Sequence, residues 1–191
     1  MNYLGEFLSY ILLTVLAQNM LFDRAIGLDE IITAIGRKKL LPRLVLVVSA
    51  YSTVGVMFTW LLSRFVSGQS AYLLFAMMYL LICGVVYFGS DRLLLQISPE
   101  THDVWNPILP HALINSVAVG APLAVLAGGI PHWYAALGAG IGSGLGVGLA
   151  VLIVMNGMDI LNQPDMPEAF RGTPALLLYI GILSLGFCAF L

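Results

Sequence analysis

Four polar side chains stand out in this sequence because their oxygen atoms could bind a hard cation. Asn19 and Asn115 lie within long apolar runs, Asp29 follows the first of these runs, and Ser116 directly follows Asn115. Carboxylate, amide and hydroxyl oxygens are the ligands that hard cations prefer. The sequence therefore predicts a candidate polar site made of Asn19, Asp29, Asn115 and Ser116, with an exposed loop position for Asp29 as the alternative.

The sequence lacks the residue patterns of zinc sites and of nucleophilic catalytic sites. Cys83 and Cys188 both lie inside apolar runs, and no CxxC pair or Cys/His cluster is present. Three scattered histidines give no zinc-ligand spacing, and no Ser–His–Asp or Cys–His arrangement can be picked out. We predict no independent catalytic activity and leave open whether any metal is bound.

The composition identifies the class of protein. The 191 residues carry a net charge of −2, only 9% are charged, and 60% are hydrophobic. Mean hydropathy is +0.96, whereas a soluble domain has about 25% charged residues. Disorder, a water-soluble domain and nucleic-acid binding are excluded by this balance. The sequence predicts an all-α membrane protein.

Six apolar runs are each close to the roughly 20 residues needed to cross a bilayer. They are Leu4–Phe22, Leu40–Leu62, Ala71–Phe88, Ile108–Ala127, Trp133–Met155 and Pro174–Leu191. Together they use most of the chain, so residues 1–191 are predicted to form a single transmembrane domain of six helices.

The basic residues predict the orientation of these helices. Seven of the eight follow spans one or three or precede span six, and only Arg64 lies on the other side. The seven are Arg24, Arg37, Lys38, Lys39, Arg43, Arg92 and Arg171. The positive-inside rule then places both termini outside the cytoplasm, in the cell (inner) membrane.

The layout of three spans on each side of 92–106 indicates two inverted three-helix repeats, at about 1–95 and 96–191. Asn19 and Asn115 lie 96 residues apart, close to half the chain length. Either they mark interruptions of helices one and four that meet near the midplane, or each makes a helix–helix hydrogen bond. The short apolar stretch 31–35 is either a re-entrant half-helix or an amphipathic surface helix.

Glycine occupies every second position in part of the fifth span. These residues are Gly138, Gly140, Gly142, Gly144, Gly146 and Gly148. Their overlapping GxxxG spacings favour close helix packing in lipid. A flexible or gating helix is the alternative, because glycine is a poor helix former.

Three segments resemble one family: residues 18–29 (QNMLFDRAIGLD), 109–120 (LPHALINSVAVG) and 166–172 (MPEAFRG). They resemble the paired six-span subunits of the Rnf and sodium-pumping NADH:quinone oxidoreductase (Nqr) complexes, and the outward termini resemble the RnfA/NqrE type. The resemblance implies a partner of opposite topology, with flavin or iron–sulfur subunits as further partners. It also implies a [2Fe–2S] cluster held by cysteines of helices one and four.

This chain departs from the family where those cysteines are expected, because Asp29 and Ser116 occupy the two positions. Iron–sulfur clusters are held mainly by thiolates. We therefore expect no cofactor on this chain, with flavin or iron–sulfur centres confined to partner subunits.

Three functions remain open at this stage. The first is a cluster-free membrane subunit of an Rnf/Nqr-like electron-transport or ion-translocating complex. The second is a small inverted-repeat transporter or channel for an ion or small solute. The third is a structural partner that packs through the glycines of the fifth span.

Overall fold

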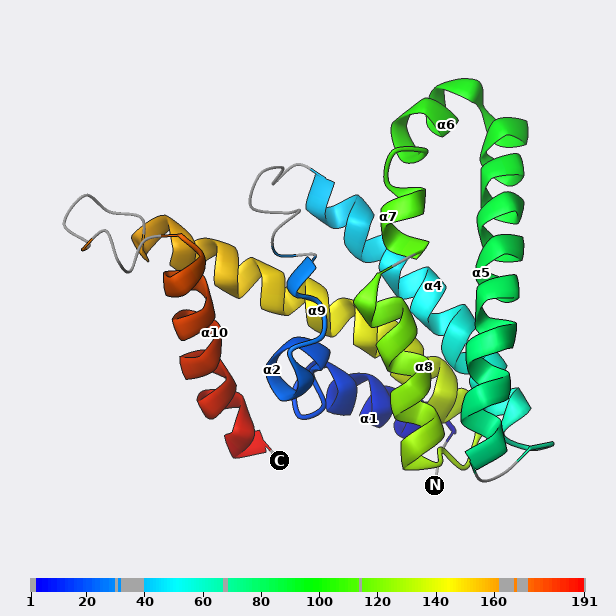
Figure 1. Cartoon of the computed structure of the whole chain (residues 1–191), viewed down its shortest axis with the longest axis horizontal. Coiled ribbons are helices and arrows are strands. Elements are labelled where there is room, and N and C mark those ends of the chain that lie inside the picture. Colours follow the sequence, from blue (N-terminus) through cyan, green and yellow to red (C-terminus); the bar gives the residue numbers. More distant parts are fainter. Residues whose placement is uncertain are drawn as a thin grey trace.

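A computed structural model describes residues 3–29, 31, 40–66, 69–113, 115–161, 167 and 172–190. Within these ranges the chain is all-helical and contains no strand (Figure 1). The elements are α1 (Tyr3–Val15), α2 (Met20–Arg24), α4 (Leu41–Leu62), α5 (Gln69–Ile97), α6 (Pro99–Trp105), α7 (Leu109–Leu113), α8 (Ser116–Gly128), α9 (Trp133–Leu161), α10 (Thr173–Phe187) and the 3-10 turn η3 (Cys188–Phe190).

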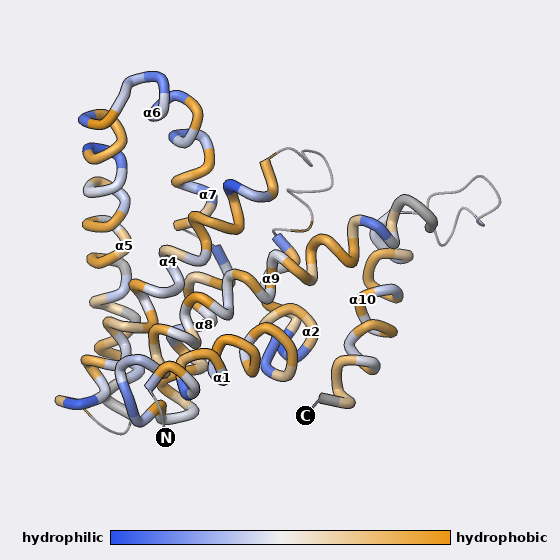
Figure 2. The backbone as a smooth tube through the Cα atoms, turned by 180° about the vertical axis from the view of Figure 1, so that it is seen from behind, coloured by the Kyte–Doolittle hydropathy of each residue, from blue (hydrophilic) through white to orange (hydrophobic). Residues whose placement is uncertain are grey.

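Four helical segments of the described chain are long and apolar enough to cross a membrane. They are Leu41–Leu62, Tyr72–Ile97, Leu109–Gly128 and Trp133–Met158. Two shorter apolar helices, Tyr3–Val15 and Thr173–Phe187, lie near the two ends of the described chain. Figure 2 shows hydrophobic residues along most of these helices, with hydrophilic residues gathered around α6 and the adjoining end of α5. The prediction of an all-α, multi-pass membrane protein is confirmed.

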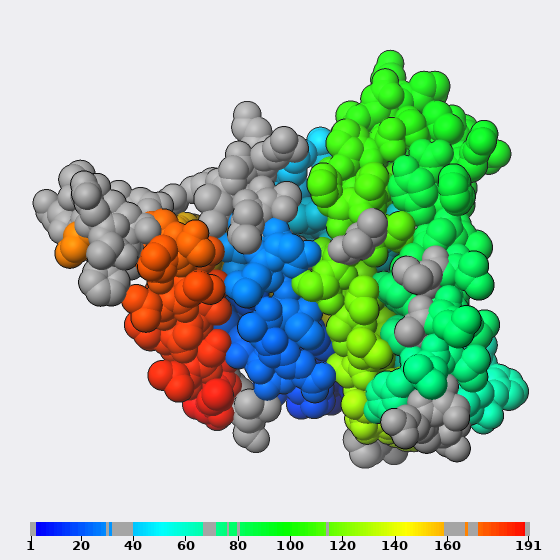
Figure 3. All heavy atoms as spheres, in the orientation of Figure 1, coloured from blue at the N-terminus to red at the C-terminus, as the bar shows by residue number. Residues whose placement is uncertain are grey.

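Helix α9 forms the centre of the bundle. About 67% of the residues in its most apolar stretch are buried. It packs against α1 on one side and α4 on the other. Helix α8 covers α4, and α2 lies beside α9 and α10. In the space-filling view, α1 and α2 lie between α10 and the α7–α8 segment (Figure 3).

Helix α5 lies at the edge of the bundle. Only 12% of the residues in its most apolar stretch are buried. Its surface carries exposed apolar side chains such as Leu73, Met77, Leu81 and Val85. Figure 1 shows both chain ends at the lower side of the molecule and the α5–α6 corner at the upper side. The orientation of these sides across the membrane stays a prediction.

Part of the sequence pattern falls outside the described residues. This applies to the apolar stretch 32–35, to Arg37, Lys38 and Lys39, and to the 166–172 motif except Pro167 and Gly172.

Candidate functional site at two helix interruptions

Asn19 lies where the first apolar run is interrupted. Helix α1 ends at Val15, and Asn19 has extended backbone angles (φ −62°, ψ 120°) as the N-cap of α2. Its Oδ1 accepts a hydrogen bond from the Leu21 N–H at 3.1 Å. Its Nδ2 donates to the carbonyls of Val15 and of Gly146 in α9, both at 2.8 Å. This fully buried amide therefore joins both sides of the interruption to the central helix.

Asn115 has the same local role in the second half of the chain. Helix α7 ends at Leu113, and Asn115 (φ −91°, ψ 141°) is the N-cap of α8. Its Oδ1 accepts a hydrogen bond from the Val117 N–H at 2.7 Å, and only 2% of the residue is exposed. Both apolar runs are thus interrupted at an asparagine that satisfies a backbone N–H at the start of the next helix.

Asp29 and Ser116 lie in direct contact, although 87 residues separate them. The Ser116 hydroxyl donates to Asp29 Oδ1 at 2.5 Å, and the Ser116 N–H approaches Asp29 Oδ2 at 3.4 Å. The same hydroxyl accepts a hydrogen bond from the Gly27 N–H at 2.9 Å. Because Ser116 is the first residue of α8, the carboxylate lies at a helix N-terminus, where the helix dipole favours negative charge.

The backbone turn after α2 brings Asp29 to this position. Ala25 ends α2 in the left-handed region (φ 55°), and Gly27 also has positive φ (108°). These two residues reverse the chain after one short helix. The segment therefore turns back toward α8, and Gly120 of α8 packs closely against Ile26.

The four predicted site residues thus form two kinds of contact. Asp29 and Ser116 come together, whereas Asn19 and Asn115 each cap their own helix. The Asn19 Nδ2 group donates both of its hydrogen bonds to backbone carbonyls, those of Val15 and Gly146. A cation that took the Asn19 oxygen as a ligand would compete with the Leu21 N–H for it.

The six predicted packing glycines lie on two faces of α9. Gly138, Gly142 and Gly146 face α1 and the segment that follows it, where an added Cβ at Gly138 would lie 2.6 Å from the Phe7 carbonyl oxygen. Gly140, Gly144 and Gly148 face α4, where an added Cβ at Gly140 would lie 2.5 Å from the Thr53 Cα. A further interhelical hydrogen bond runs from the Ser52 hydroxyl to the Gly140 carbonyl at 2.8 Å.

The residues at the family's cysteine positions do not fit an iron–sulfur cluster. Asp29 and Ser116 supply a carboxylate and a hydroxyl in place of thiolates, and they hydrogen-bond to each other at 2.5 Å. Cys83 lies on α5 and Cys188 in η3, outside these contacts. Over the described ranges, no group of three or more His, Cys, Asp or Glu residues could hold a metal ion.

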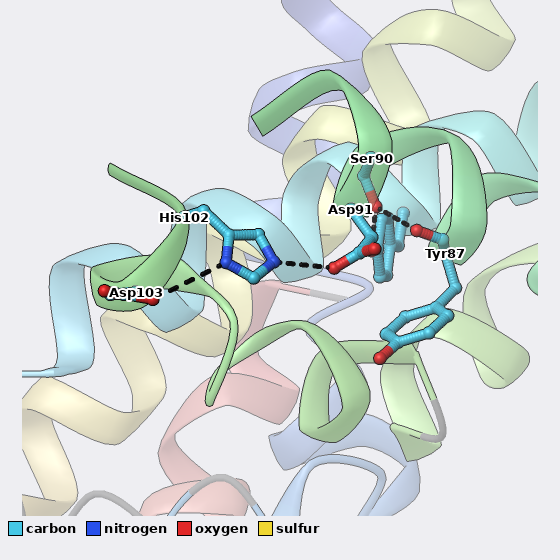
Figure 4. Close-up of polar contacts among 6 residues, drawn as sticks. Tyr87, Ser90, Asp91, His102 and Asp103 are labelled. Atoms are coloured by element: carbon cyan, nitrogen blue, oxygen red, sulfur yellow. Dashed lines mark hydrogen bonds and ion pairs between the residues drawn. The ribbon is translucent and has the colours of Figure 1, made fainter. Parts of the chain in front are cut away.

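A polar cluster at the α5–α6 corner was not anticipated. His102 Nε2 lies 2.8 Å from Asp91 Oδ1, and its Nδ1 lies 3.7 Å from Asp103 Oδ1 (Figure 4). The Tyr51 hydroxyl is 2.9 Å from the Ser90 hydroxyl, which joins α4 to the same end of α5. The Ser-Pro pair at 98–99 is a typical helix start, and it could have indicated that α6 folds back onto α5.

A second unanticipated cluster joins α1 to the start of α9. Glu6 Oε1 lies 3.1 Å from His132 Nδ1, and Glu6 Oε2 accepts a hydrogen bond from the Tyr134 hydroxyl at 3.0 Å. The His132 and Tyr134 rings stack with centroids 5.0 Å apart. No spacing rule indicates such a contact, because 126 residues separate Glu6 from His132.

Known proteins of similar sequence support the family suggested by the motifs. No protein-family model matches the chain. The A-type subunit of the ion-translocating oxidoreductase complex of Rhodobacter capsulatus is 27% identical over an alignment that covers 97% of this chain and 96% of the relative. The protein of the same name from Pectobacterium carotovorum is 26% identical over 140 residues, 72% of each chain. The resemblance to the Rnf family is therefore confirmed: over nearly its whole length, this chain has homologues named as the A-type component of an ion-translocating oxidoreductase complex.

Proposed function

We propose that this chain is the A-type membrane subunit of an Rnf-type ion-translocating oxidoreductase complex, and that it binds no [2Fe–2S] cluster itself. The observation that carries this proposal is the end-to-end match to the Rhodobacter capsulatus protein, 97% of one chain against 96% of the other. A match of this extent favours the same overall architecture, and not merely a shared apolar composition.

The two asparagine caps support an inverted repeat of residues 1–95 and 96–191. Each half has an interrupted apolar run, α1–α2 or α7–α8, followed by two further helices, α4 and α5 or α9 and α10. In each half the asparagine oxygen accepts from the N–H two residues ahead. A three-span unit crosses the membrane an odd number of times, so its second copy has the opposite topology.

We further propose a homologous six-helix subunit of opposite topology as the partner in the bilayer. The sparse internal packing of α5 supports an association of this kind, because that helix leaves most of its apolar surface uncovered. Redox centres of the complex then reside on other subunits, and both termini of this chain lie outside the cytoplasm.

Asp29 and Ser116 have a structural role in this proposal. A carboxylate that accepts two hydrogen bonds at the start of α8 closes the gap between the two interrupted helices. Both residues are exposed in the described chain, and the dipole at this helix terminus favours the negative charge of the carboxylate. The contact thus supplies a link between the helices without metal.

The test is to purify the tagged full chain from its own membranes in a mild detergent. We expect other membrane subunits and flavin- or iron–sulfur-bearing subunits to co-purify with it. Recovery of the chain alone, together with Na⁺ or solute uptake by proteoliposomes that contain only this chain, would contradict the proposal and favour the transporter.

Iron analysis of the isolated chain tests the cluster-free role. We expect no stoichiometric iron and no reducible visible spectrum. A Cys83→Ser/Cys188→Ser double variant is the matched control, because it removes every thiol of the chain. Stoichiometric iron in the wild type that is lost in this variant would overturn the assignment.

A further inference from the structure

A cavity of about 320 Å³ lies among α1, α2, α8 and α9. The α1 side contributes Tyr10 and Thr14, the α9 side contributes Ser143, and the interrupted segment contributes Gln18 and Arg24. The α8 wall is formed by small and apolar residues between Ala121 and Gly128. The cavity thus has a polar side near the first interruption and an apolar side along the C-terminal half of α8.

The position of Arg24 is the unexpected feature. The positive-inside count places this residue in a connection after the first span, but its side chain lines the same cavity as Tyr10 of α1 and Val125 of α8. Both helices are apolar and belong to the predicted membrane spans. A basic side chain within a membrane domain is costly unless it has partners, and it is a functional-site candidate by default.

Arg24 has unused hydrogen-bonding capacity. Its Nε donates to Asp23 Oδ2 at 3.2 Å, and 44% of its side chain is exposed. The terminal nitrogens have no partner among the residues that the structure describes. One edge of the guanidinium is therefore paired and the other is available.

The other polar groups around the cavity favour a ligand that accepts hydrogen bonds. The Thr14 and Ser143 hydroxyls already donate to carbonyls of their own helices, at 2.8 Å and 2.6 Å. The Tyr10 hydroxyl and the Gln18 amide have no partner within the described ranges. Among the described residues that line the cavity, Arg24 is the one charged group, and its partner Asp23 lies outside the lining. The groups that face the cavity are therefore better suited to an anion than to a cation.

We propose that this cavity binds a phosphate oxyanion through Arg24, with Tyr10 and Gln18 as further donors. A guanidinium binds phosphate oxygens through paired N–H donors, and basic pockets between membrane helices accept lipid head groups. At about 30 Å³ per water molecule, the cavity holds roughly ten waters, which is enough for a head group but not for two acyl chains. The apolar α8 wall suits the glycerol end of such a lipid, while the chains stay in the bilayer.

The test uses the full chain, purified and delipidated in detergent, and measures binding of phosphatidylglycerol, phosphatidylcholine and inorganic phosphate by native mass spectrometry and thermal shift. Arg24→Gln removes the charge. Ala124→Phe fills the cavity and leaves Arg24 intact. Arg92→Gln on α5 is the control with the same loss of charge away from the cavity.

We expect the wild type and Arg92→Gln to bind phosphatidylglycerol more tightly than phosphatidylcholine. Arg24→Gln and Ala124→Phe should each weaken that binding at least tenfold. Binding of inorganic phosphate with the same variant dependence identifies a free anion as a source, and binding of phosphatidylglycerol alone identifies a lipid. Equal phosphatidylglycerol binding by the wild type and both cavity variants would overturn the proposal, as would equal binding of the two lipids.

Discussion

Replacement of Asn19 tests whether a single buried amide holds the first interruption in place. Asn19→Ala removes the cap of α2 together with both Nδ2 hydrogen bonds, to Val15 and to Gly146. Asn19→Asp keeps an oxygen for the Leu21 N–H but replaces the donor with an oxygen that faces two carbonyls. The two substitutions therefore separate the cap from the link to α9.

The expected cost follows from these contacts. Loss of an asparagine cap costs about 1 kcal/mol, and each hydrogen bond lost within a membrane domain costs about 0.6–1 kcal/mol. Asn19→Ala should thus lower the free energy of unfolding by about 2–3 kcal/mol, or the melting temperature by roughly 5–10 °C. Asn19→Asp should cost at least as much, because carbonyl–carboxylate repulsion replaces two hydrogen bonds.

Asn115→Asp is the matched control. It preserves the cap acceptor for the Val117 N–H and, like Asn19→Asp, places a carboxylate at a buried N-cap. Asn19→Asp should therefore cost about 1–2 kcal/mol more, because it alone loses the two Nδ2 hydrogen bonds. Unfolding would be followed by far-UV circular dichroism during titration with sodium dodecyl sulfate and by thermal melts in detergent. Equal stability of Asn19→Asp and Asn115→Asp would refute the link between Asn19 and α9.

Three further substitutions have defined outcomes in the same unfolding assay. Gly144→Ala forces a methyl group against the α4 backbone and should cost about 1–3 kcal/mol of stability. The control Gly84→Ala meets nothing within 4 Å and should be neutral or stabilising by up to about 1 kcal/mol. Equal effects of the two substitutions would contradict the close packing of α9. Asp29→Asn removes the charge at the start of α8, so it should cost about 0.3–1 kcal/mol of stability. It should leave transport or electron transfer by the complex unchanged. Loss of ion transport without loss of stability would favour an ion site at Asp29. Ser52→Ala removes one interhelical hydrogen bond and should cost about 1 kcal/mol, and no change would show that the bond contributes nothing.

The sequence predicted the helical class and the places where helices are interrupted better than it predicted contacts across the bundle. Asparagine is among the preferred N-cap residues, so its presence within an apolar run indicates a helix start in the middle of a span. The four-residue spacing of the glycines predicted close packing. It could not reveal which neighbours lie on each side, since α1 and α4 are far from α9 in the chain.

Long-range contacts account for what the sequence missed. The charge count does not reveal that Arg24 lines a cavity, because this depends on the interruption after α1 that lets α2 pack against α8 and α9. The left-handed turn at Ala25 and Gly27 then returns the chain toward α8. The contact of Asp29 with Ser116 depends on this turn and on the interruption at Asn115 together. Neither feature can be read from the spacing of polar residues alone.

The placement of α9 constrains how the molecule can move. Its two glycine faces hold it against α1 and α4, which come from the first half of the chain, while α9 itself belongs to the second half. A shift of one residue along either contact would bring side chains such as Ile141 or Leu145 against the neighbouring backbone. Residues 1–95 and 96–191 are therefore interlocked through these three helices, so a movement of α9 along its axis must displace α1 or α4.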